Sequence, residues 1–407
     1  MTNLTTAPTL FASVEMAPRD PILGLTEAFI ADTSPSKVNL GVGVYYDDNG
    51  KVPLLAAVRA AEEARMKAAP PRGYQPIEGP TTYNQAVQAL LFGAESPVVK
   101  DARAVTVKSL GGTGALKVGA DFLRRLLPAA KIYISDPSWE NHRALFEAAG
   151  FAVETYPYYD PVTRGVNFAA MKATLAKLSA RSIVVLHACC HNPTGADLTE
   201  SQWREVVDIV GARGLVAFVD IAYQGFAEGI ERDAIALKLF ADAGLSFLVA
   251  SSFSKSFSLY GERVGALTAV TESKDEAERV LSQIKRIVRT NYSNPPTHGG
   301  AVVAAVLADA ALRKLWEEEL AGMRDRIRSM RSSLVEKLKA RGIKDDFSFL
   351  LHQRGMFSYT GLTATQVEHL RSDFGIYAVG TGRICVAALN SGNIDFVAAA
   401  IASVLKR

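Results

Sequence analysis

The feature that most constrains this fold is an alternation, from about residue 100 onward, of short apolar runs with helical stretches. The pattern predicts strands at 104–110, 131–135, 183–190, 216–219, 247–251 and 264–270. Strands that alternate with helices build a mostly parallel sheet covered by helices, so we predict an α/β domain. The run at 264–270 follows its predecessor too closely for a crossover helix, and we expect it to be antiparallel.

Polar clusters follow the predicted strands, where an α/β sheet places its ligands. The clusters are Gly111–Gly114, Asp136–Trp139, Asn192–Gly195, Asp220–Tyr223 and Ser252–Ser256. Because the carboxyl ends of parallel strands share one edge of a sheet, we expect these clusters to meet in one site.

The character of the chain changes near residue 311. Apolar residues from Leu312 to Leu338 recur mostly every three or four positions, which predicts one long amphipathic helix. Strands are then expected at 347–351, 356–359 and 384–388, and helices at 363–374 and from about 394. We predict an arm at 1–16, a smaller α+β domain built from 17–50 and 323–407, and a large domain at 51–322.

Composition excludes several classes of protein. The 407 residues carry 45 Lys and Arg against 42 Asp and Glu, a net charge of +3 with no dense basic run, so nucleic acid is not an expected partner. The three cysteines, Cys189, Cys190 and Cys385, are too few for a disulfide framework and fit a reducing compartment. No signal peptide is evident and no apolar run is long enough to span a membrane. We therefore predict a soluble, cytoplasmic protein.

Two of the polar clusters have a chemical and a structural interpretation. Gly111-Gly112-Thr113-Gly114 between a strand and a helix is suited to bind phosphate on backbone N–H groups, or is a plain tight turn. Asp220 at a strand end can pair with a protonated ring nitrogen, and Tyr223 can donate to a ring oxygen. The alternative for Asp220 is a helix cap.

Lys255 is the candidate nucleophile. A lysine in a partly dry pocket near other cations has a lowered pKa and can form an imine, whereas an ordinary lysine is a surface residue. Here Lys255 stands among serines, with Arg263 eight residues on. Arg263, Arg289 and Arg383 also lie beside turn or strand signals, and arginine binds phosphate and carboxylate in a bidentate manner.

Two patterns invite other functions. His187-Ala188-Cys189-Cys190-His191 offers metal ligands, but on one strand they are too close together to surround one zinc ion, so we predict packing and no metal. Ser252-Phe253-Ser254-Lys255 fits the S-x-x-K pattern of penicillin-recognising serine enzymes. Their K-T-G motif is absent from the chain, and their serine opens a helix rather than ending a strand.

Longer motifs decide between these readings. The chain resembles the pyridoxal-phosphate-dependent class I aminotransferases of the aspartate and aromatic amino-acid kind, over nearly its whole length from Pro21. The matching motifs are Val38–Tyr45, Cys189–Gly195, Asp220–Phe226, Ser252–Gly265 and Asn291–Pro296. The resemblance implies fold type I, a homodimer with shared active sites, and ping-pong transamination of an amino acid with a 2-oxo acid. Lyases and decarboxylases of the same fold would not need both Arg289 and Arg383.

The resemblance also implies a role for each matching residue. Lys255 corresponds to the imine-forming lysine and proton shuttle, and Asp220 to the carboxylate that keeps the pyridine nitrogen protonated. Tyr223 and Asn192 correspond to the partners of the ring hydroxyl oxygen. The remaining cofactor positions are the phosphate-binding Gly112, Thr113, Ser252 and Arg263, the neighbouring subunit's counterpart of Tyr74, the indole Trp139 over the ring, and His142 beside Asp220.

The substrate positions follow in the same way. Arg383 and the backbone at Gly43 correspond to the holders of the α-carboxylate, with Trp139 and Asn192 beside it. Arg289 corresponds to the residue from the partner subunit that takes the distal carboxylate of aspartate or glutamate. A dicarboxylate partner implies 2-oxoglutarate and glutamate as one half of the reaction.

The second substrate depends on a few positions near the entrance. Tyr46 and Val52 stand where aspartate-specific relatives carry lysine and threonine, and more apolar surface favours an aromatic side chain. Thr113 and Asn294 keep the aspartate-type residues, and Gly73 fits neither type. We predict an aromatic amino-acid aminotransferase that also accepts aspartate; the alternative is a strict aspartate aminotransferase.

Overall fold

The computed structural model describes residues 9–17 and 22–407. The predicted arm lies partly outside these residues, as do Pro21 and the start of the segment 17–50. Within the described ranges, no helix is both long enough and apolar enough to cross a membrane.

A seven-stranded sheet forms the centre of the larger part of the molecule, in the order β2-β10-β9-β8-β7-β3-β4. Its strands are β2 Ala104–Leu110, β3 Lys131–Asp136, β4 Ala152–Pro157, β7 Ile183–His187, β8 Val216–Ile221, β9 Phe247–Ser252 and β10 Val264–Val270. The neighbours β9, β8, β7, β3 and β4 pair in parallel, whereas β10 is antiparallel to both β9 and β2. The mostly parallel sheet and the antiparallel run at 264–270 are thereby confirmed.

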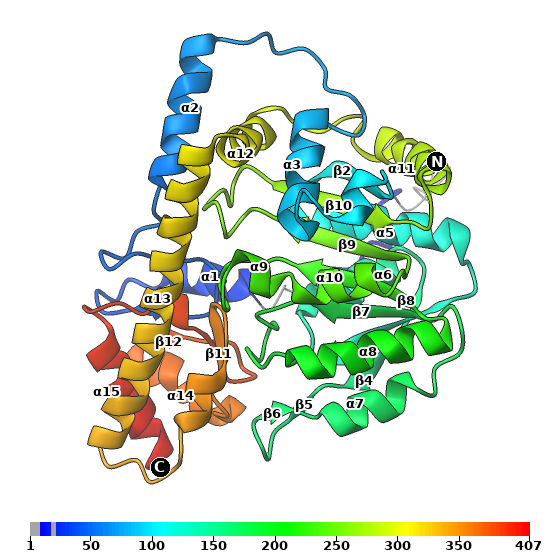
Figure 1. Ribbon diagram of the computed structural model, residues 1–407. Coiled ribbons are helices and arrows are strands. Elements are labelled where there is room, and N and C mark those ends of the chain that lie inside the picture. The colour runs from blue at the N-terminus through cyan, green and yellow to red at the C-terminus, as the bar shows by residue number, and fades with distance from the viewer. Residues whose placement is uncertain (1–8, 18–21) are drawn as a thin grey trace, which may run out of the picture.

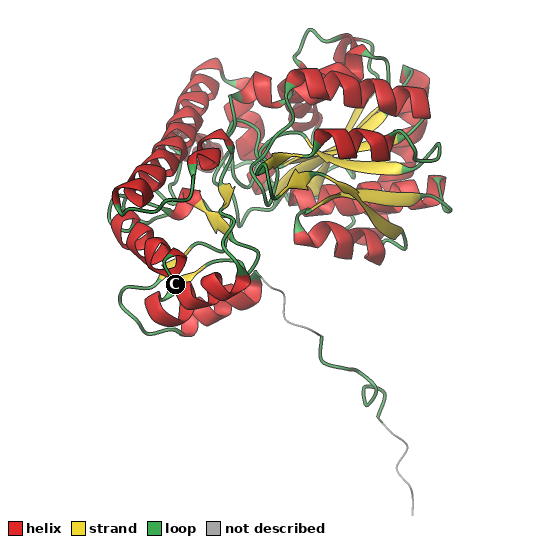
Figure 2. Cartoon of the chain, turned by 90° about the horizontal axis from the view of Figure 1, so that it is seen from below, coloured by secondary structure: helices red, strands yellow, loops and turns green. Residues whose placement is uncertain are grey.

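Helices cover both faces of this sheet (Figure 2). The helices of this part are α2 Ala56–Ala68, α3 Thr81–Phe92, α4 Pro97–Lys100, α5 Gly111–Leu126, α6 Glu140–Ala148, α7 Phe168–Leu175, α8 Glu200–Arg213, α9 Ile230–Asp233, α10 Ile235–Asp242, α11 Lys274–Asn291 and α12 His298–Ala308. Along β7, Val184 and Leu186 enter one hydrophobic core, while Ile183 and Val185 enter the other. This period of two on a strand buried on both faces explains why the strands read as continuous apolar runs.

Helix starts and ends follow local signals. The side chain of Thr199 accepts from the backbone N–H of Gln202 at the start of α8, and Gln202 reciprocates in a capping box. Gly214 ends that helix in the left-handed region, at φ 61°. Thr363 and Gln366 repeat the capping box at the start of α14 (Ala364–Phe374), where the sequence predicts a helix.

The long amphipathic helix is α13, Ala310–Ala340, which runs along one side of the molecule (Figure 1). α15 (Ile394–Leu405) packs against α13. The buried residues of α13 include Trp316, Leu320, Met323 and Ile327. The predicted domain boundary at 322/323 falls inside α13. Helix α1 (Leu23–Ala31) also lies in this region of Figure 1.

Small sheets join segments that are far apart in the sequence. β1 (Val38–Asn39) pairs in parallel with β12 (Ile376–Tyr377), and β11 (Phe357–Tyr359) pairs with β13 (Arg383–Cys385). The remaining pair is β5 (Tyr159–Asp160) with β6 (Gly165–Val166). The β1–β12 ladder supports the proposal that 17–50 and 323–407 belong to one smaller domain.

Three predicted strands differ from the structure. Residues 348–352 form a 3-10 helix, because Asp346 accepts from the backbone N–H and the hydroxyl of Ser348 and closes a turn there. The strand predicted at 384–388 ends at Cys385 and continues as a 3-10 helix, Val386–Ala388.

The third difference affects the metal argument. The strand predicted at 183–190 ends at His187, because Asp197 accepts from the backbone N–H groups of Cys190 and His191 and bends the chain. Cys190 takes the left-handed conformation, at φ 52°. The expectation that the residues from His187 to His191 lie on one strand is therefore wrong.

Candidate active site

A pocket of about 490 Å³ lies at the carboxyl ends of the central strands, against the smaller part of the molecule. Eleven of the predicted site residues line it: Gly43, Gly112, Thr113, Trp139, Asn192, Asp220, Tyr223, Ser252, Lys255, Arg263 and Arg383. Sheet topology explains this gathering, since β2, β3, β8 and β9 all end at this edge.

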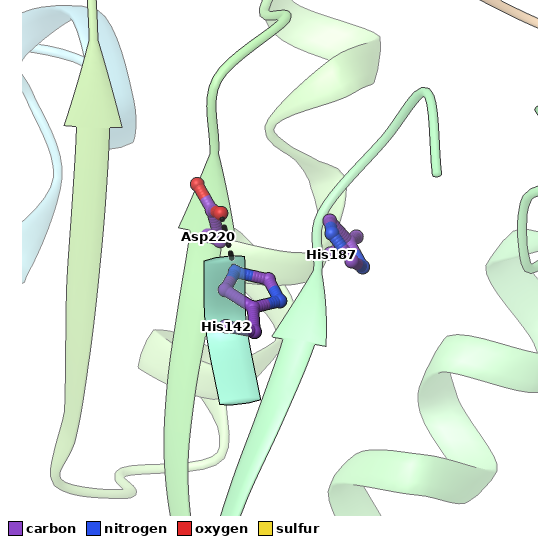
Figure 3. A group of neighbouring side chains, drawn as sticks. All are labelled: His142, His187 and Asp220. Carbon is purple, nitrogen blue, oxygen red and sulfur yellow. Dashed lines mark hydrogen bonds and ion pairs between the residues drawn. The ribbon is translucent and has the colours of Figure 1, made fainter. Parts of the chain in front are cut away.

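The floor of the pocket contains a buried carboxylate. Asp220, on β8, is 6% exposed, and its Oδ2 lies 3.0 Å from Nε2 of His142 on α6, as Figure 3 shows. An ionised carboxylate only accepts, so Nε2 of His142 carries a proton, while Nδ1 lies 2.9 Å from the hydroxyl oxygen of Ser138. The structure therefore places His142 in contact with Asp220.

The charge of Asp220 is maintained despite its burial. Burial raises the pKa of Asp220, but the His142 hydrogen bond and the positive potential of His142 and Lys255 outweigh it, so the pKa of Asp220 is lowered from its usual value. The pocket therefore presents a permanent negative charge at its floor at neutral pH.

His187 is a lining residue that the sequence reasoning assigned to packing. Its ring centroid lies 5.0 Å from that of His142 (Figure 3) and 4.5 Å from that of His191. Burial, together with the charge of His142, lowers the pKa of His187 to about 3, so its ring is neutral. His142, His187 and Asp220 could in principle hold a metal ion, but the Nε2 of His142 is already committed to Asp220.

Lys255 follows β9 and faces the same space. Its Nζ lies 4.9 Å from the centroid of the Tyr223 ring. Burial lowers the pKa of Lys255 to about 8; Asp220 opposes this shift and Arg263 adds to it. A lysine with this lowered pKa has a larger neutral, nucleophilic fraction near neutral pH than an ordinary lysine has.

The opposite wall is an anion-binding cradle. α5 begins at Gly111 immediately after β2, so its first turn, whose backbone N–H groups have no partner within the helix, lines the pocket at Gly112 and Thr113. A Cβ on Gly112 would lie 3.1 Å from the Cβ of Ser252, and one on Gly111 would lie 2.5 Å from Nη2 of Arg263. Nη1 of Arg263 donates to Ser254 Oγ at 3.3 Å. Glycine is required here because the helix start is packed directly against an arginine and serines.

Arg383 forms the other cationic part of the pocket and is only 2% exposed. Its Nη1 donates to Asn192 Oδ1 at 3.0 Å and its Nη2 to the carbonyl of Gly41 at 2.7 Å, while its Nε has no hydrogen-bond partner among the residues that the structure describes. The guanidinium lies 4.3 Å from the ring centroid of Phe357. Nη1 also forms a long ion pair with Oε2 of Glu140, 3.8 Å away.

Tyr260 and Phe357 are lining residues that the sequence reasoning missed. The Tyr260 hydroxyl accepts from the backbone N–H of Tyr45 at 2.9 Å and so joins the Gly43 segment to the large domain. Tyr260 lies within the motif Ser252–Gly265, which was its only sequence signal. Phe357 had none, because an apolar residue on a short strand reads as core.

Three predicted residues do not line the pocket: His142, which lies behind Asp220, and Tyr74 and Arg289, which lie farther away. Tyr74 is 95% exposed in the segment between α2 and α3. Arg289 lies exposed near the end of α11, where its guanidinium donates to Ser293 Oγ. A single chain therefore does not bring these two side chains to Lys255.

Comparison with known proteins identifies the family of this chain. The family model for aminotransferase class I and II matches residues 35–401.

The chain belongs to the class I and II aminotransferases. Family membership confirms the predicted transaminase activity, the fold and the pyridoxal phosphate cofactor. The penicillin-recognising alternative does not hold, and Ser252 is the last residue of β9 rather than the start of a helix.

Similar proteins carry both of the names that the sequence left open. An aspartate aminotransferase of Pseudomonas aeruginosa is 66% identical over 97% of this chain and 100% of its own length. An aromatic-amino-acid aminotransferase of Escherichia coli is 53% identical over 97% of this chain and 100% of its own. A crystal structure of an aromatic-amino-acid aminotransferase from Burkholderia pseudomallei, covalently bound to pyridoxal phosphate, is 67% identical with a TM-score of 0.96, covering 98% of this chain and 100% of that one.

Proposed function

We propose that the enzyme transfers amino groups between an aromatic amino acid or aspartate and 2-oxoglutarate, in a ping-pong cycle at sites shared by two subunits. The observation that carries the proposal is the placement of Lys255, Asp220 and Arg383 in one pocket beside an anion cradle. Lys255 would react with the aldehyde of the cofactor, and Asp220 would pair with its pyridine nitrogen. Arg383 would bind the α-carboxylate of the substrate.

The residues present fit pyridoxal phosphate. The start of α5 with Gly112 and Thr113, together with Ser252 and Arg263, would hold the phosphate, since glycines leave its backbone N–H groups accessible. Asp220, fixed by His142, would pair with the protonated ring nitrogen. Asn192 and Tyr223 would contact the ring oxygen, and Trp139 would cover the ring. When bound, the cofactor supplies an electron sink for the charge that forms at the substrate α-carbon.

The protein's own groups carry the proton transfers. Lys255 Nζ takes the α-proton and returns it in the reverse half, which its lowered pKa permits. Arg383 binds the α-carboxylate of the substrate through the side of the guanidinium that carries Nε. The backbone at Gly43 lies beside this carboxylate. The low polarity around Phe357 strengthens this ion pair by excluding water.

A homodimer would complete the site. Tyr74 and Arg289 are exposed in one chain, and the described part of the arm carries the exposed apolar side chains Leu10, Phe11, Val14 and Met16. In the proposed dimer, Tyr74 reaches the phosphate of the other subunit and Arg289 takes the distal carboxylate of its substrate.

A hybrid-dimer experiment tests the sharing of sites. Lys255→Ala and Arg289→Leu chains, co-expressed with different tags, form a hybrid that has one wholly wild-type site if each site uses Lys255 of one chain and Arg289 of the other. The purified hybrid should then recover about half of the wild-type activity with aspartate. Recovery no greater than that of the parent dimers would show that both residues act within one chain.

The aromatic preference is supported by Tyr46 and Val52. Tyr46 packs against the core cluster, and Val52 is 45% exposed near the same segment. Single-turnover half-reactions with phenylalanine, tyrosine and aspartate measure the preference as a ratio of kcat/KM. A ratio far below one for the aromatic substrates would establish the strict aspartate alternative instead. The cytoplasmic location stays a prediction.

A further inference from the structure

Lys108 is a buried lysine that the transamination site does not use. It lies on β2, is 1% exposed, and does not line the pocket. Its Nζ donates to the carbonyl of Pro296 and lies 5.9 Å from the ring centroid of Tyr83. Within the described residues, no carboxylate forms an ion pair with it. Burying a charged lysine without an ion-pair partner costs free energy, so the position of Lys108 calls for an explanation.

Two glycines make room for this side chain. A Cβ on Gly300 would lie 2.3 Å from Lys108 Cε, and one on Gly79 would lie 2.7 Å from Lys108 Cβ. The aliphatic stem is therefore enclosed at both ends, and the ammonium has a fixed location at the carbonyl of Pro296.

Lys108 contacts both ends of one turn. The Tyr292 hydroxyl donates to the backbone carbonyl of Lys108 at 3.2 Å, and the Lys108 ammonium holds Pro296. Between these contacts, Ser293 takes the left-handed conformation at φ 68°, and its hydroxyl accepts from Arg289. The turn at 292–296 thus connects Lys108 to the guanidinium of Arg289.

Below about pH 8, the charged ammonium is the main form of Lys108. Burial lowers the pKa of Lys108 to about 8, and Glu262, in the loop before β10, opposes the shift. Tyr83 and Tyr292 are the other titratable groups that face it, and burial raises the pKa of both. A charged donor binds a carbonyl more strongly than a neutral one does.

We propose that Lys108 is a positioning residue for dicarboxylate substrates: by holding the turn at 292–296, it fixes the place of Arg289. This inference rests on the proposed role of Arg289 at the partner's site. Lys108 touches neither substrate nor cofactor, so its effect depends on whether the substrate has a distal carboxylate.

The test uses the Lys108→Met holoenzyme in single-turnover half-reactions with aspartate and with phenylalanine. We expect kcat/KM for aspartate to fall about tenfold, mainly through KM, since a charge-assisted hydrogen bond is lost. With phenylalanine the change should stay below about twofold. Equal losses with both substrates, or no loss with aspartate, would overturn the proposal.

Two further variants separate positioning from a general packing defect. Gly300→Ala keeps the lysine but displaces its ammonium, and should reproduce the aspartate-selective loss if Lys108→Met fails to fold. Thr106→Val is the matched control on the same strand: it removes the buried hydrogen bond between Thr106 and Thr268, 2.8 Å long, and should lower Tm without changing selectivity. A selectivity change in the control equal to that of Lys108→Met would contradict the proposal.

Arg289→Leu distinguishes the two levels of the argument. If Arg289→Leu leaves the aspartate half-reaction unchanged, the proposed function of Arg289 fails and this inference fails with it. If Arg289→Leu is selective for aspartate, adding Lys108→Met should cause no further selective loss, because the two act through one guanidinium. A further tenfold selective loss in the double variant would refute positioning through Arg289 alone.

Discussion

The pocket floor and the Tyr292–Pro296 turn differ in how completely one chain assembles them. At the floor, Asp220, His142 and Lys255 meet because parallel strands end, and the helix after β3 begins, at one edge of the sheet. At the turn, Arg289 at the end of α11 is exposed, and its guanidinium donates to the hydroxyl of Ser293. The comparison teaches that motifs of equal clarity in sequence can belong to a site completed inside the fold or to one that needs a second chain.

The largest expected effect is at the floor. Lys255→Ala should lower the half-reaction rate roughly 10⁴-fold or more for every amino acid, because both the nucleophile and the proton carrier are lost. Stopped-flow absorbance of the cofactor measures the rate, and Lys274→Ala, in the first turn of α11, is the control. A variant that kept a tenth of wild-type activity would remove Lys255 from the mechanism.

Asp220→Asn probes the charge at the floor without changing its shape. We expect kcat to fall roughly 10²- to 10³-fold, because the protonated ring nitrogen loses its preorganised partner. His142→Asn, which removes the group that orients Asp220, should cost about tenfold, as expected for one hydrogen bond to a carboxylate. Steady-state kinetics with saturating cofactor compare the two, and a larger loss in His142→Asn would reverse their assigned roles.

Arg289→Leu tests the other region. We predict that kcat/KM for aspartate falls about 10²-fold while that for phenylalanine changes less than about threefold, because only the dicarboxylate loses an ion pair. The measurement is the pair of half-reactions. Uniform loss across substrates would make Arg289 part of the general site and erase the contrast drawn between the two regions.

The smallest effect is on stability. The pKa of Lys255 falls from 10.5 to about 8 on folding, first through burial and then through Arg263. The fold therefore favours the neutral amine, so the contribution of Lys255 to stability increases as the pH rises from about 8 to 10.5 and is at its lowest below 8. Urea unfolding of the cofactor-free wild type and of Lys255→Met should show the variant to be the more stable at pH 7.5, with the gap closing at pH 9.5. A gap that widened with pH would mean that Lys255 is held as an ammonium.

Much of the site could be predicted from sequence because its residues lie beside strand ends. Gly112, Asp220 and Ser252 each stand at or next to the end of an apolar run, and the pocket contains all three. The sequence predicts packing for His187 because the apolar run suggests a strand that continues to Cys190. The turn stabilised by Asp197 ends the strand earlier, and hydrophobic periodicity does not indicate that turn. Residues 347–351 were taken for a strand because a short apolar run does not distinguish a strand from a 3-10 turn.

By itself the sequence determined the sheet, the long helix and the chemistry of the cofactor, because hydrophobic periodicity and contiguous motifs are local properties of the chain. Only the tertiary structure showed that Arg383 is buried against Asn192 and Phe357, that Tyr260 joins the Gly43 segment to the large domain, and that Lys108 holds a turn 188 residues away in the sequence. Such contacts depend on how distant segments pack. The pattern of residues along β2 therefore cannot show that glycines on other segments leave space for Lys108.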